Sequence, residues 1–311
     1  MAEGNRNNYK SKNNRRPQGT RSQSTRLQGA LRQQDTRQQA PVLPYSTTSP
    51  WEASAERHRA IDAKIVILCC GAPAVPAALL GLATGSWIAG PVVGVCIVVA
   101  SAFFLWNKCT SWLLKSIGCT PVGSGQYQHA ITVIQGICDS VGIKLPHLYV
   151  VDDPSINALS VGTSQKYMSL VFTSALADTL SSLEIEAAMA HEILHLRSRE
   201  ATVGTLAAFA ALPLVVVFPG MSKAVYRISG KGRELPTDIR AVSLTRHPPS
   251  LYSALKLMSG SAGRTRLLKT AAGRATKYLW TVPLGEQPEN MNQAGNVDHP
   301  YVRMSALQEL Y

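Results

Sequence analysis

The sequence predicts an α+β protein in which helices and a small sheet follow a two-helix transmembrane hairpin. A run over 65–106 contains no charged residue, and at about 20 residues per crossing it is long enough for two spans. Further along, 148–151 and 169–173 are short apolar segments typical of strands, and 181–196 has the apolar spacing of a helix. A content of 45% hydrophobic and only 16% charged residues also favours a membrane protein.

The first region, residues 1–60, differs from all that follows. Residues 1–40 carry nine basic residues against two acidic ones, and this excess supplies +7 of the net charge of +12. The remainder is mostly Asn, Gln, Ser, Gly and Thr, which cannot bury enough apolar surface to fold, so we expect a basic disordered tail. It could touch anionic lipid or RNA, but it lacks the interleaved aromatic residues of specific RNA binding, so a nucleic-acid partner is not expected.

The second region, residues 61–115, is the predicted transmembrane hairpin. Its turn is expected at 83–90, where Gly85, Ser86 and Trp87 interrupt the apolar run. Basic residues flank the run on both sides: Arg57, Arg59, Lys64, Lys108 and Lys115. Since positive charge favours the cytoplasmic side, both ends of the hairpin and the domain after it are expected in the cytoplasm.

The third region, residues 116–311, contains His191-Glu192-Ile193-Leu194-His195. On a helix, His191 and His195 lie one turn apart on one face, so both imidazoles can reach one Zn²⁺. Glu192 then lies where it can take a proton from a water that the metal activates. The spacing of Ser181 and Glu184 predicts a capping box at the start of this helix.

A third metal ligand is predicted in the stretch 233–238. Glu234 supplies a carboxylate, and Asp238 follows four residues later on the same helical face. His, His and Glu with one open position form a catalytic zinc arrangement, and a second carboxylate can orient a ligand imidazole. From the residues alone, Glu234 is equally compatible with a solvated surface charge.

The order of these motifs resembles the HtpX-like membrane metalloproteases, relatives of the CAAX prenyl endopeptidases, over about 125–310. Four blocks carry the resemblance: 142–162, 191–200, 233–258 and 299–310. It implies a zincin-type domain with His191, His195 and Glu234 as zinc ligands, Glu192 as general base and Asp238 supporting a ligand. Glu200 occupies the family's acidic position after the second histidine.

The resemblance also implies residues for substrate binding. Asn157 and Ala158 match an edge strand that takes up the substrate backbone, although a turn-forming Asn at an ordinary sheet edge explains the same residues. His299 matches a histidine on the oxyanion side, and a surface histidine is the alternative. Two departures stand out: Pro236 lies between the ligand and the aspartate, which places the helix start near 233, and Arg303 is two residues closer to His299 than usual.

The uncharged stretch 203–219 is an apolar insertion between ligands. Only 38 residues (196–233) separate His195 from Glu234, which is too few for two crossings of a bilayer and a turn. With Pro213 favouring a bend, we expect a broken, shallowly inserted or re-entrant hairpin near the site, or buried core.

Together these features predict a membrane-anchored zinc endopeptidase with one Zn²⁺ per chain. The expected substrates are unfolded or misassembled membrane proteins, as in stress-related quality control, and the expected location is a bacterial-type inner membrane in contact with lipid. The alternatives are a CAAX-type processing peptidase and a catalytically weak zinc-bound membrane scaffold. The six cysteines lack CxxC spacing and predict neither a disulfide framework nor a metal role.

Overall fold

The computed structural model describes residue 79 and residues 88–218, 220–230, 232–285 and 298–310. All of these belong to one compact unit that starts at Pro50. The predicted basic tail, nearly all of the first predicted span and most of the predicted turn at 83–90 lie outside the described residues.

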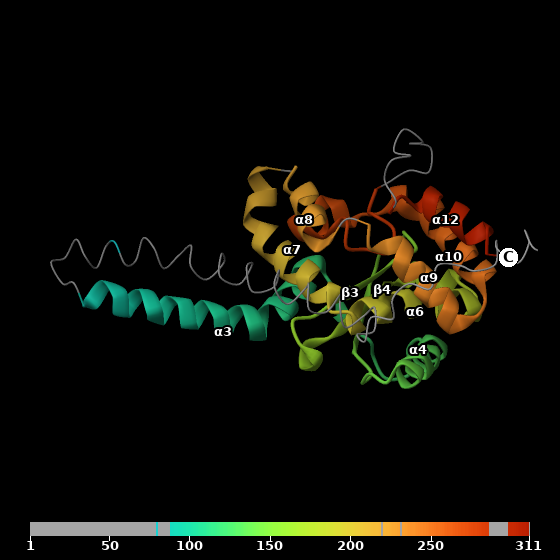
Figure 1. Ribbon diagram of the computed structural model, residues 1–311, viewed down its shortest axis with the longest axis horizontal. Helices are drawn as coiled ribbons and strands as arrows, with labels where there is room; N and C mark the ends of the chain where they lie inside the picture. The colour runs from blue at the N-terminus through green and yellow to red at the C-terminus, as the bar shows by residue number, and fades with distance from the viewer. Residues whose placement is uncertain (1–78, 80–87, 219, 231, 286–297, 311) are drawn as a thin grey trace, which may run out of the picture. The chain divides into compact units, whose positions relative to one another are not determined.

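The described elements alternate between helices and a few short strands, which confirms the α+β prediction (Figure 1). The longer helices are α3 (Ala89–Ile117), α4 (Gln128–Val141), α6 (Ser182–Arg197), α7 (Glu200–Val217), α8 (Met221–Gly230), α9 (Glu234–Thr245), α10 (Pro248–Ser261) and α12 (Pro300–Gln308). Shorter helices are α5 (Ser174–Thr179) and α11 (Ala271–Thr276). The strands are β1 (Thr120–Pro121), β2 (His147–Val151), β3 (Ala158–Val161) and β4 (Ser169–Thr173).

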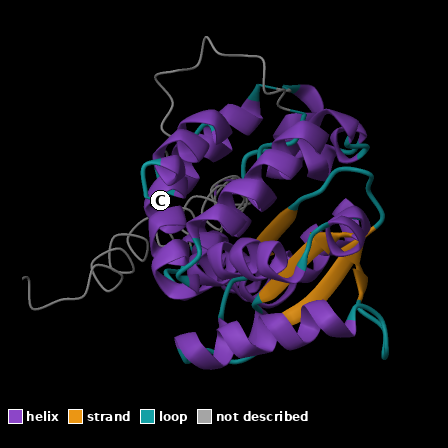
Figure 2. Cartoon of the chain, turned by 90° about the vertical axis from the view of Figure 1, so that its right-hand side faces the viewer, coloured by secondary structure: helices purple, strands orange, loops and turns teal. Residues whose placement is uncertain are grey.

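The four strands form one sheet in the order β1-β2-β4-β3 (Figure 2). β2 and β4 are parallel, whereas β1 and β3 run antiparallel to their neighbours. β3 is therefore the edge strand on the side of the zinc helix, and α6 packs against it. The three predicted strand segments and the edge position of β3 are confirmed.

Side chains alternate across the sheet into two hydrophobic cores, as strand geometry requires. On β4, Leu170 and Phe172 enter a core with α4, α6, α9 and α10. Val171 points the other way, into a second core with α7, α11 and the C-terminal half of α3. The sheet thus separates the helices of the motif from the apolar helices.

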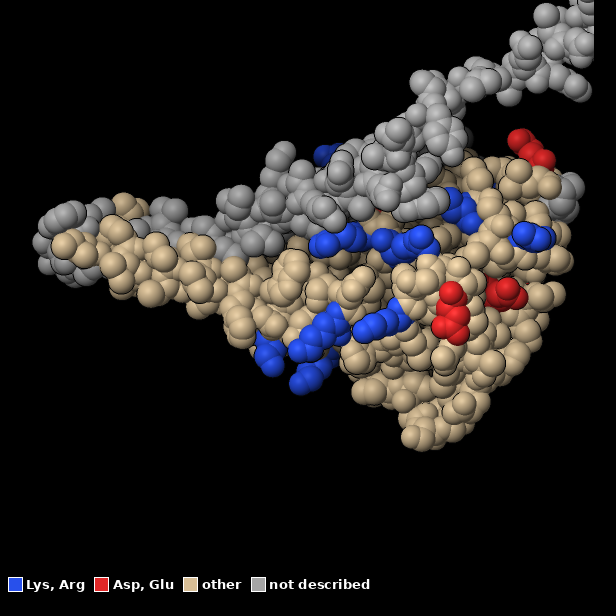
Figure 3. Space-filling view, turned by 60° about the horizontal axis from the view of Figure 1, so that its bottom comes forward, with Lys and Arg blue, Asp and Glu red and all other residues tan. Residues whose placement is uncertain are grey.

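Among the described residues, two helices are long and apolar enough to cross a membrane, by length and composition. In α3, 17% of the apolar window is buried, against 61% in α7. The hairpin was predicted over 61–115, and α3 continues past the uncharged run to Ile117, where Gly118 in the left-handed conformation caps it. Its C-terminal half is held in the second core through Cys109 and Leu113. Its first part, 89–107, contains no charged residue, and Figure 3 shows that part without blue or red side chains on the visible face.

The insertion 203–219 forms most of α7, which continues without a break through Pro213. The expected break at this proline is therefore wrong, and the next helix, α8, packs along α7. The first half of α7 is buried, while Leu214, Val217 and Phe218 near its end are exposed. The insertion is thus core at its start and apolar surface at its end.

Candidate metal centre

The first two ligand side chains lie on α6, whose N-terminus has the predicted capping box. The Ser181 amide donates to Glu184 at 2.8 Å, which satisfies a backbone group that a helix start leaves unpaired. The helix buries His191 and His195, one turn apart, beneath the rest of the domain. An apolar helix therefore carries two polar side chains into a site that solvent scarcely reaches.

The third candidate ligand begins α9. Glu234 is the first residue of this helix and Pro236 lies in its first turn, where a missing N–H costs no helical hydrogen bond. Asp298, from the chain just before α12, accepts hydrogen bonds from the backbone N–H groups of Gly232 and Glu234 at 2.6 and 3.1 Å. Pro236 is therefore accommodated, and a distant carboxylate holds the ligand in place.

The three candidate donor atoms converge at one point. His191 Nε2 lies 3.0 Å from Glu234 Oε2 and 3.0 Å from His195 Nε2, and the His195 Nε2 to Glu234 Oε2 distance is 3.6 Å. Around a tetrahedral Zn²⁺ with bonds of about 2.0–2.1 Å, donor atoms lie roughly 3.3 Å apart. The spacing and the chemistry of this donor set thus fit a metal ion of that size.

Each histidine is oriented from behind by a buried carboxylate. Asp238 Oδ1 lies 2.7 Å from Nδ1 of His191, and Glu200 Oε2 lies 2.5 Å from Nδ1 of His195. Carboxylates at both Nδ1 atoms favour the tautomer with Nε2 free to bind a metal. The position of Asp238 on the same face as Glu234 matches the predicted four-residue spacing.

The charges around the site shift the pKa values of the candidate ligands so that the charged form of each is favoured. Burial lowers the pKa of His195, but Glu234 and Glu200 outweigh it and raise that pKa to about 9. Burial raises the pKa of Glu234, yet His195 and Arg233 hold it well below its usual value. The cluster therefore attracts a cation, and a proton competes with a metal for the imidazole.

Glu192 follows the first histidine and is buried. Its Oε1 accepts a hydrogen bond from the Thr281 hydroxyl at 2.6 Å, and its Oε2 has no hydrogen-bond partner within the described part of the chain. A buried carboxylate with one oxygen held and the other available is suited to accept a proton.

Arg303 is a residue of the site that the sequence left in doubt. It is fully buried on α12 and donates to both Asp238 oxygens, at 2.6 and 2.8 Å. Its guanidinium also lies 3.6 Å from Glu234 Oε2. The shortened spacing from His299 therefore does not keep Arg303 from the site, and the pKa of Asp238, which burial raises, is lowered by Arg303 and His191.

The residues predicted to bind substrate are buried at the outer edge of β3. The Asn157 amide donates to the Val282 carbonyl at 2.6 Å, and the Ala158 carbonyl accepts from the Thr281 N–H at 2.9 Å. The chain's own segment 280–282 thus lies along the edge expected to receive a substrate. His299 is buried too; its Nδ1 accepts from Tyr301 N, and its Nε2 has no hydrogen-bond partner among the residues described.

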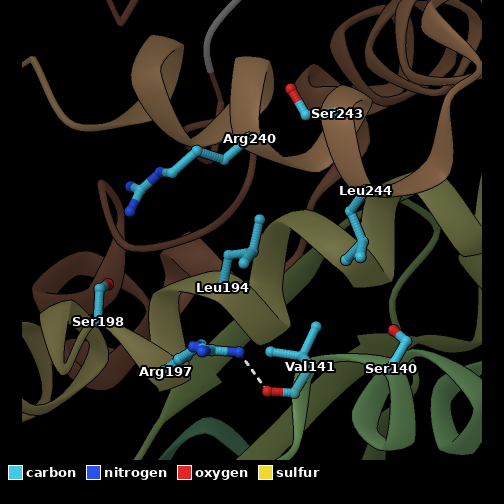
Figure 4. Close-up of a pocket in the computed structure, with 8 residues that line it drawn as sticks. All are labelled: Ser140, Val141, Leu194, Arg197, Ser198, Arg240, Ser243 and Leu244. Atoms are coloured by element: carbon cyan, nitrogen blue, oxygen red, sulfur yellow. Dashed lines mark hydrogen bonds between the residues drawn. The ribbon is translucent and has the colours of Figure 1, made fainter. Parts of the chain in front are cut away.

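A separate pocket of about 290 Å³ lies beyond the ligands, between the ends of α4 and α6 and the side of α9 (Figure 4). Arg197 reaches across it to the Val141 carbonyl. Arg240, on its opposite wall, lies 3.7 Å from Glu200 Oε1. The pocket contains none of the three candidate ligands, but two of its lining residues contact the site: Arg240 near Glu200, and Ser198, whose hydroxyl donates to the His195 carbonyl at 3.3 Å.

The fold and the site define a class of protein. A helix with two buried imidazoles and a carboxylate between them, a further carboxylate from a second helix, and an adjacent edge strand are the parts of a metallopeptidase. Comparison with known proteins agrees, because residues 126–275 match the family model described as Peptidase family M48. Residues 126–275 are thus similar to M48 peptidases, and the similarity to HtpX-like proteases supports a metalloendopeptidase.

Similar proteins share the name "Protease HtpX homolog". The one from Dictyoglomus turgidum is 26% identical over 199 residues, which cover 54% of this chain and 66% of that protein. The one from Dictyoglomus thermophilum is 27% identical over 202 residues, covering 55% and 67%. One from Listeria monocytogenes serotype 4a is 25% identical over 224 residues, covering 57% and 72%. The chain thus spans about two thirds of the length of these relatives, and no solved structure matches it significantly.

Proposed function

We propose that this chain is a membrane-anchored, zinc-dependent endopeptidase that hydrolyses unfolded or misassembled membrane proteins in quality control. The observation that carries the proposal is the buried convergence of His191, His195 and Glu234. Two nitrogen donors and one oxygen donor suit Zn²⁺, and three protein ligands leave a fourth position open, as in catalytic zinc sites. Because these three residues form one convergent set of ligands, we expect one zinc ion per chain.

The proposed reaction is the addition of water to a peptide carbonyl. Zinc, when bound, supplies Lewis acidity and makes water a stronger acid. Glu192 accepts a proton from the attacking water on Oε2 and returns it to the leaving amine as the C–N bond breaks. The hydroxyl stays on the carbonyl carbon, so the products are a carboxylic acid and an amine, which exchange a proton at neutral pH to give a carboxylate and an ammonium. Glu192 ends in its starting state.

His299 is proposed to stabilise the oxyanion that develops on the substrate carbonyl. Its support is chemical, since a buried ring nitrogen with no hydrogen-bond partner in the described region is available as a donor. Its neighbour Asp298 fixes the start of α9, so movement of the His299 backbone is limited. The backbone of His299 also begins α12, which carries Arg303.

Asn157 and Ala158 are proposed to shape the substrate cleft at the edge of β3. Their polar groups hold segment 280–282, so their effect on substrate would pass through that segment. Direct pairing of a substrate with the Ala158 carbonyl would require the Thr281 N–H to leave it. The two possibilities predict opposite changes in activity. Loosening segment 280–282 lowers activity if the segment is part of the cleft and raises activity if the segment blocks the edge.

Membrane anchoring is supported by the apolar surface of α3 and the end of α7. A cleft of about 760 Å³ between these helices is lined by apolar side chains, among them Phe104, Trp112 and Phe209. Exposed apolar surface of this extent favours contact with lipid. Lys108 and Lys115 in the second half of α3 support a cytoplasmic position for the catalytic domain, in an inner membrane that the chain crosses more than once.

The test uses the full chain purified in detergent, with zinc content and cleavage of unfolded casein as readouts. We expect about one zinc per chain, cleavage by the wild type, and loss of both in Glu234→Gln. Glu186→Gln, on the partly exposed side of α6, is the matched control and should change neither.

Other outcomes separate the alternatives. Full zinc content without any cleavage by the wild type would favour the scaffold. Cleavage confined to prenylated C-terminal peptides would favour the processing peptidase. Retention of zinc in Glu234→Gln would exclude Glu234 as a ligand.

A further inference from the structure

Segment 280–282 joins the edge of β3 to the candidate catalytic carboxylate. Trp280 lies opposite Leu159 as an antiparallel bridge, and the Thr281 N–H donates to the Ala158 carbonyl at 2.9 Å. The side chains are buried, with Trp280 in the second core and Val282 in the first. The segment is therefore anchored on both sides of the sheet.

The Thr281 side chain is the direct contact of this segment with Glu192. Its hydroxyl lies 2.6 Å from Glu192 Oε1 and 3.2 Å from the Ala158 carbonyl oxygen. A hydroxyl has one proton to donate, and the charged carboxylate at the shorter distance is the stronger acceptor. Glu192 Oε2, by contrast, has no hydrogen-bond partner in the part of the chain that is described.

The backbone of Thr281 is fixed to the ligand helices as well. Arg303 Nη1 donates to the Thr281 carbonyl at 2.5 Å, and the same guanidinium binds Asp238. Arg303 thus connects the anchor of Glu192 to the carboxylate that supports His191. Displacement of Thr281 would break contacts with Ala158, Glu192 and Arg303 together.

We propose that Thr281 is a positioning residue for the general base. Its hydroxyl holds Oε1 of Glu192 and so restricts the rotation of the carboxylate, which leaves Oε2 as the oxygen that receives the proton of water. Geometry of this kind raises the rate without binding the metal or the substrate. The inference rests on the proposed role of Glu192 and adds the residue that orients it.

The experiment compares Thr281→Val, which removes the hydroxyl, with Thr281→Ser, which keeps it, in the full chain in detergent. We expect kcat on an unfolded protein substrate to fall about 10–100-fold in Thr281→Val, the worth of a hydrogen bond to a charged group. KM and zinc content should stay near wild type, and Thr281→Ser should recover most of kcat. Thr276→Val is the matched control, because it removes another fully buried hydroxyl, which accepts from Trp280 Nε1 at 3.3 Å and so disturbs the same segment without loss of a contact to Glu192.

Three results would overturn the proposal: kcat within twofold of wild type in Thr281→Val, an equal loss in Thr276→Val, or higher activity in Thr281→Val. Higher activity would mean that 280–282 is a removable cover of β3. Thr281→Ala gives the same comparison if the valine variant does not fold. Glu192→Gln measured in parallel separates the two claims, because an active Glu192→Gln defeats the proposed function and an inactive one leaves only Thr281 in question.

Discussion

The metal centre and the apolar helices are built on opposite principles. At the centre, charged side chains are buried and held at defined distances, with Asp238 between His191 and Arg303. Along α3 and the end of α7, apolar side chains such as Val95 and Val217 are more than half exposed. A buried charge requires a partner at a defined distance, because an unpaired buried charge is costly. Exposed apolar side chains require only an apolar environment such as lipid, without a defined partner.

α7 connects the two regions, because it has a buried carboxylate at its start and exposed apolar side chains at its end. Glu200 at its start supports His195, and its last turns expose Leu214, Val216 and Val217. The helix therefore leads from the candidate metal ligands to an apolar surface within 18 residues. Changes near its start should affect metal binding, and changes near its end should affect attachment to lipid.

The largest expected effect is the loss of the base. Glu192→Gln should lower kcat about 10²–10⁴-fold, the usual worth of a general acid–base group, while zinc stays bound because Glu192 is not a ligand. Zinc content by mass spectrometry and casein cleavage measure the two effects. His191→Ala is the contrasting variant and should lose the metal itself; near-normal turnover in Glu192→Gln would remove it from the mechanism.

The second effect tests how strictly the buried charges are paired. Arg303→Gln leaves Asp238 buried without its guanidinium and should lower the free energy of unfolding by about 3–5 kcal/mol. Arg240→Gln is the control, because its side chain is 28% exposed and 3.7 Å from Glu200, and it should cost less than about 1 kcal/mol. Denaturant unfolding in detergent measures both, and equal losses would show that burial of the pair is not what matters.

Arg303 also marks the limit of what the sequence predicts. The zinc helix, its capping box and the alternation along Ser169–Thr173 follow from local spacing, which the chain carries in consecutive residues. The four-residue spacing places Glu234 and Asp238 on one helical face, but only the family resemblance favours Glu234 as a ligand. The helix start near Pro236 follows from the chemistry of proline.

The contacts of Arg303, Asp298 and Thr281 could not be predicted in this way. Each joins residues more than 60 positions apart in the sequence, and no periodicity relates them. The only signals were an acid directly before His299 and an arginine shortly after it. Similarly, composition identified α3 as apolar but not that Cys109 and Leu113 anchor its second half in the core.

A third effect concerns the support of the ligand. Asp238→Asn should weaken zinc affinity about 10–100-fold, because an amide orients the His191 imidazole less well than a carboxylate. A competition titration with a zinc chelator measures it. Asp178→Asn, on the short helix α5, is the control and should leave the affinity unchanged; an unchanged affinity in Asp238→Asn would show that its contact with His191 does not support metal binding.

A fourth effect is the pH dependence of zinc affinity. Because the pKa of His195 is raised to about 9, its protonated form predominates below that pH and a metal must displace the proton. The apparent affinity should therefore rise about tenfold per pH unit from pH 6.5 to 8.5 and level off above about 9. Chelator titrations across this range check the sign, and an affinity that is constant or falls with pH would contradict the assignment of His195 as a ligand.

The smallest effect on stability is expected at the apolar end of α7, where two valines provide a direct comparison. Val217 is 67% exposed, whereas Val215 is fully buried in the second core. Val217→Ser should change the free energy of unfolding by less than about 0.5 kcal/mol, since no packed atoms are lost. Val215→Ser should cost about 1–3 kcal/mol, because it removes buried methyl groups and buries a hydroxyl.

Binding to lipid should depend on the exposed valines of α7 and not on the buried one, the reverse of their effects on stability. If the end of α7 meets the membrane, Val217→Ser combined with Val216→Ser should reduce the adsorption of a fragment that starts at residue 104 to lipid vesicles. This fragment keeps Cys109 and Leu113, which a start at residue 116 would remove from the second core. Unchanged vesicle binding in the double variant would mean that the exposed end of α7 faces water or another protein, and that α3 alone provides the attachment.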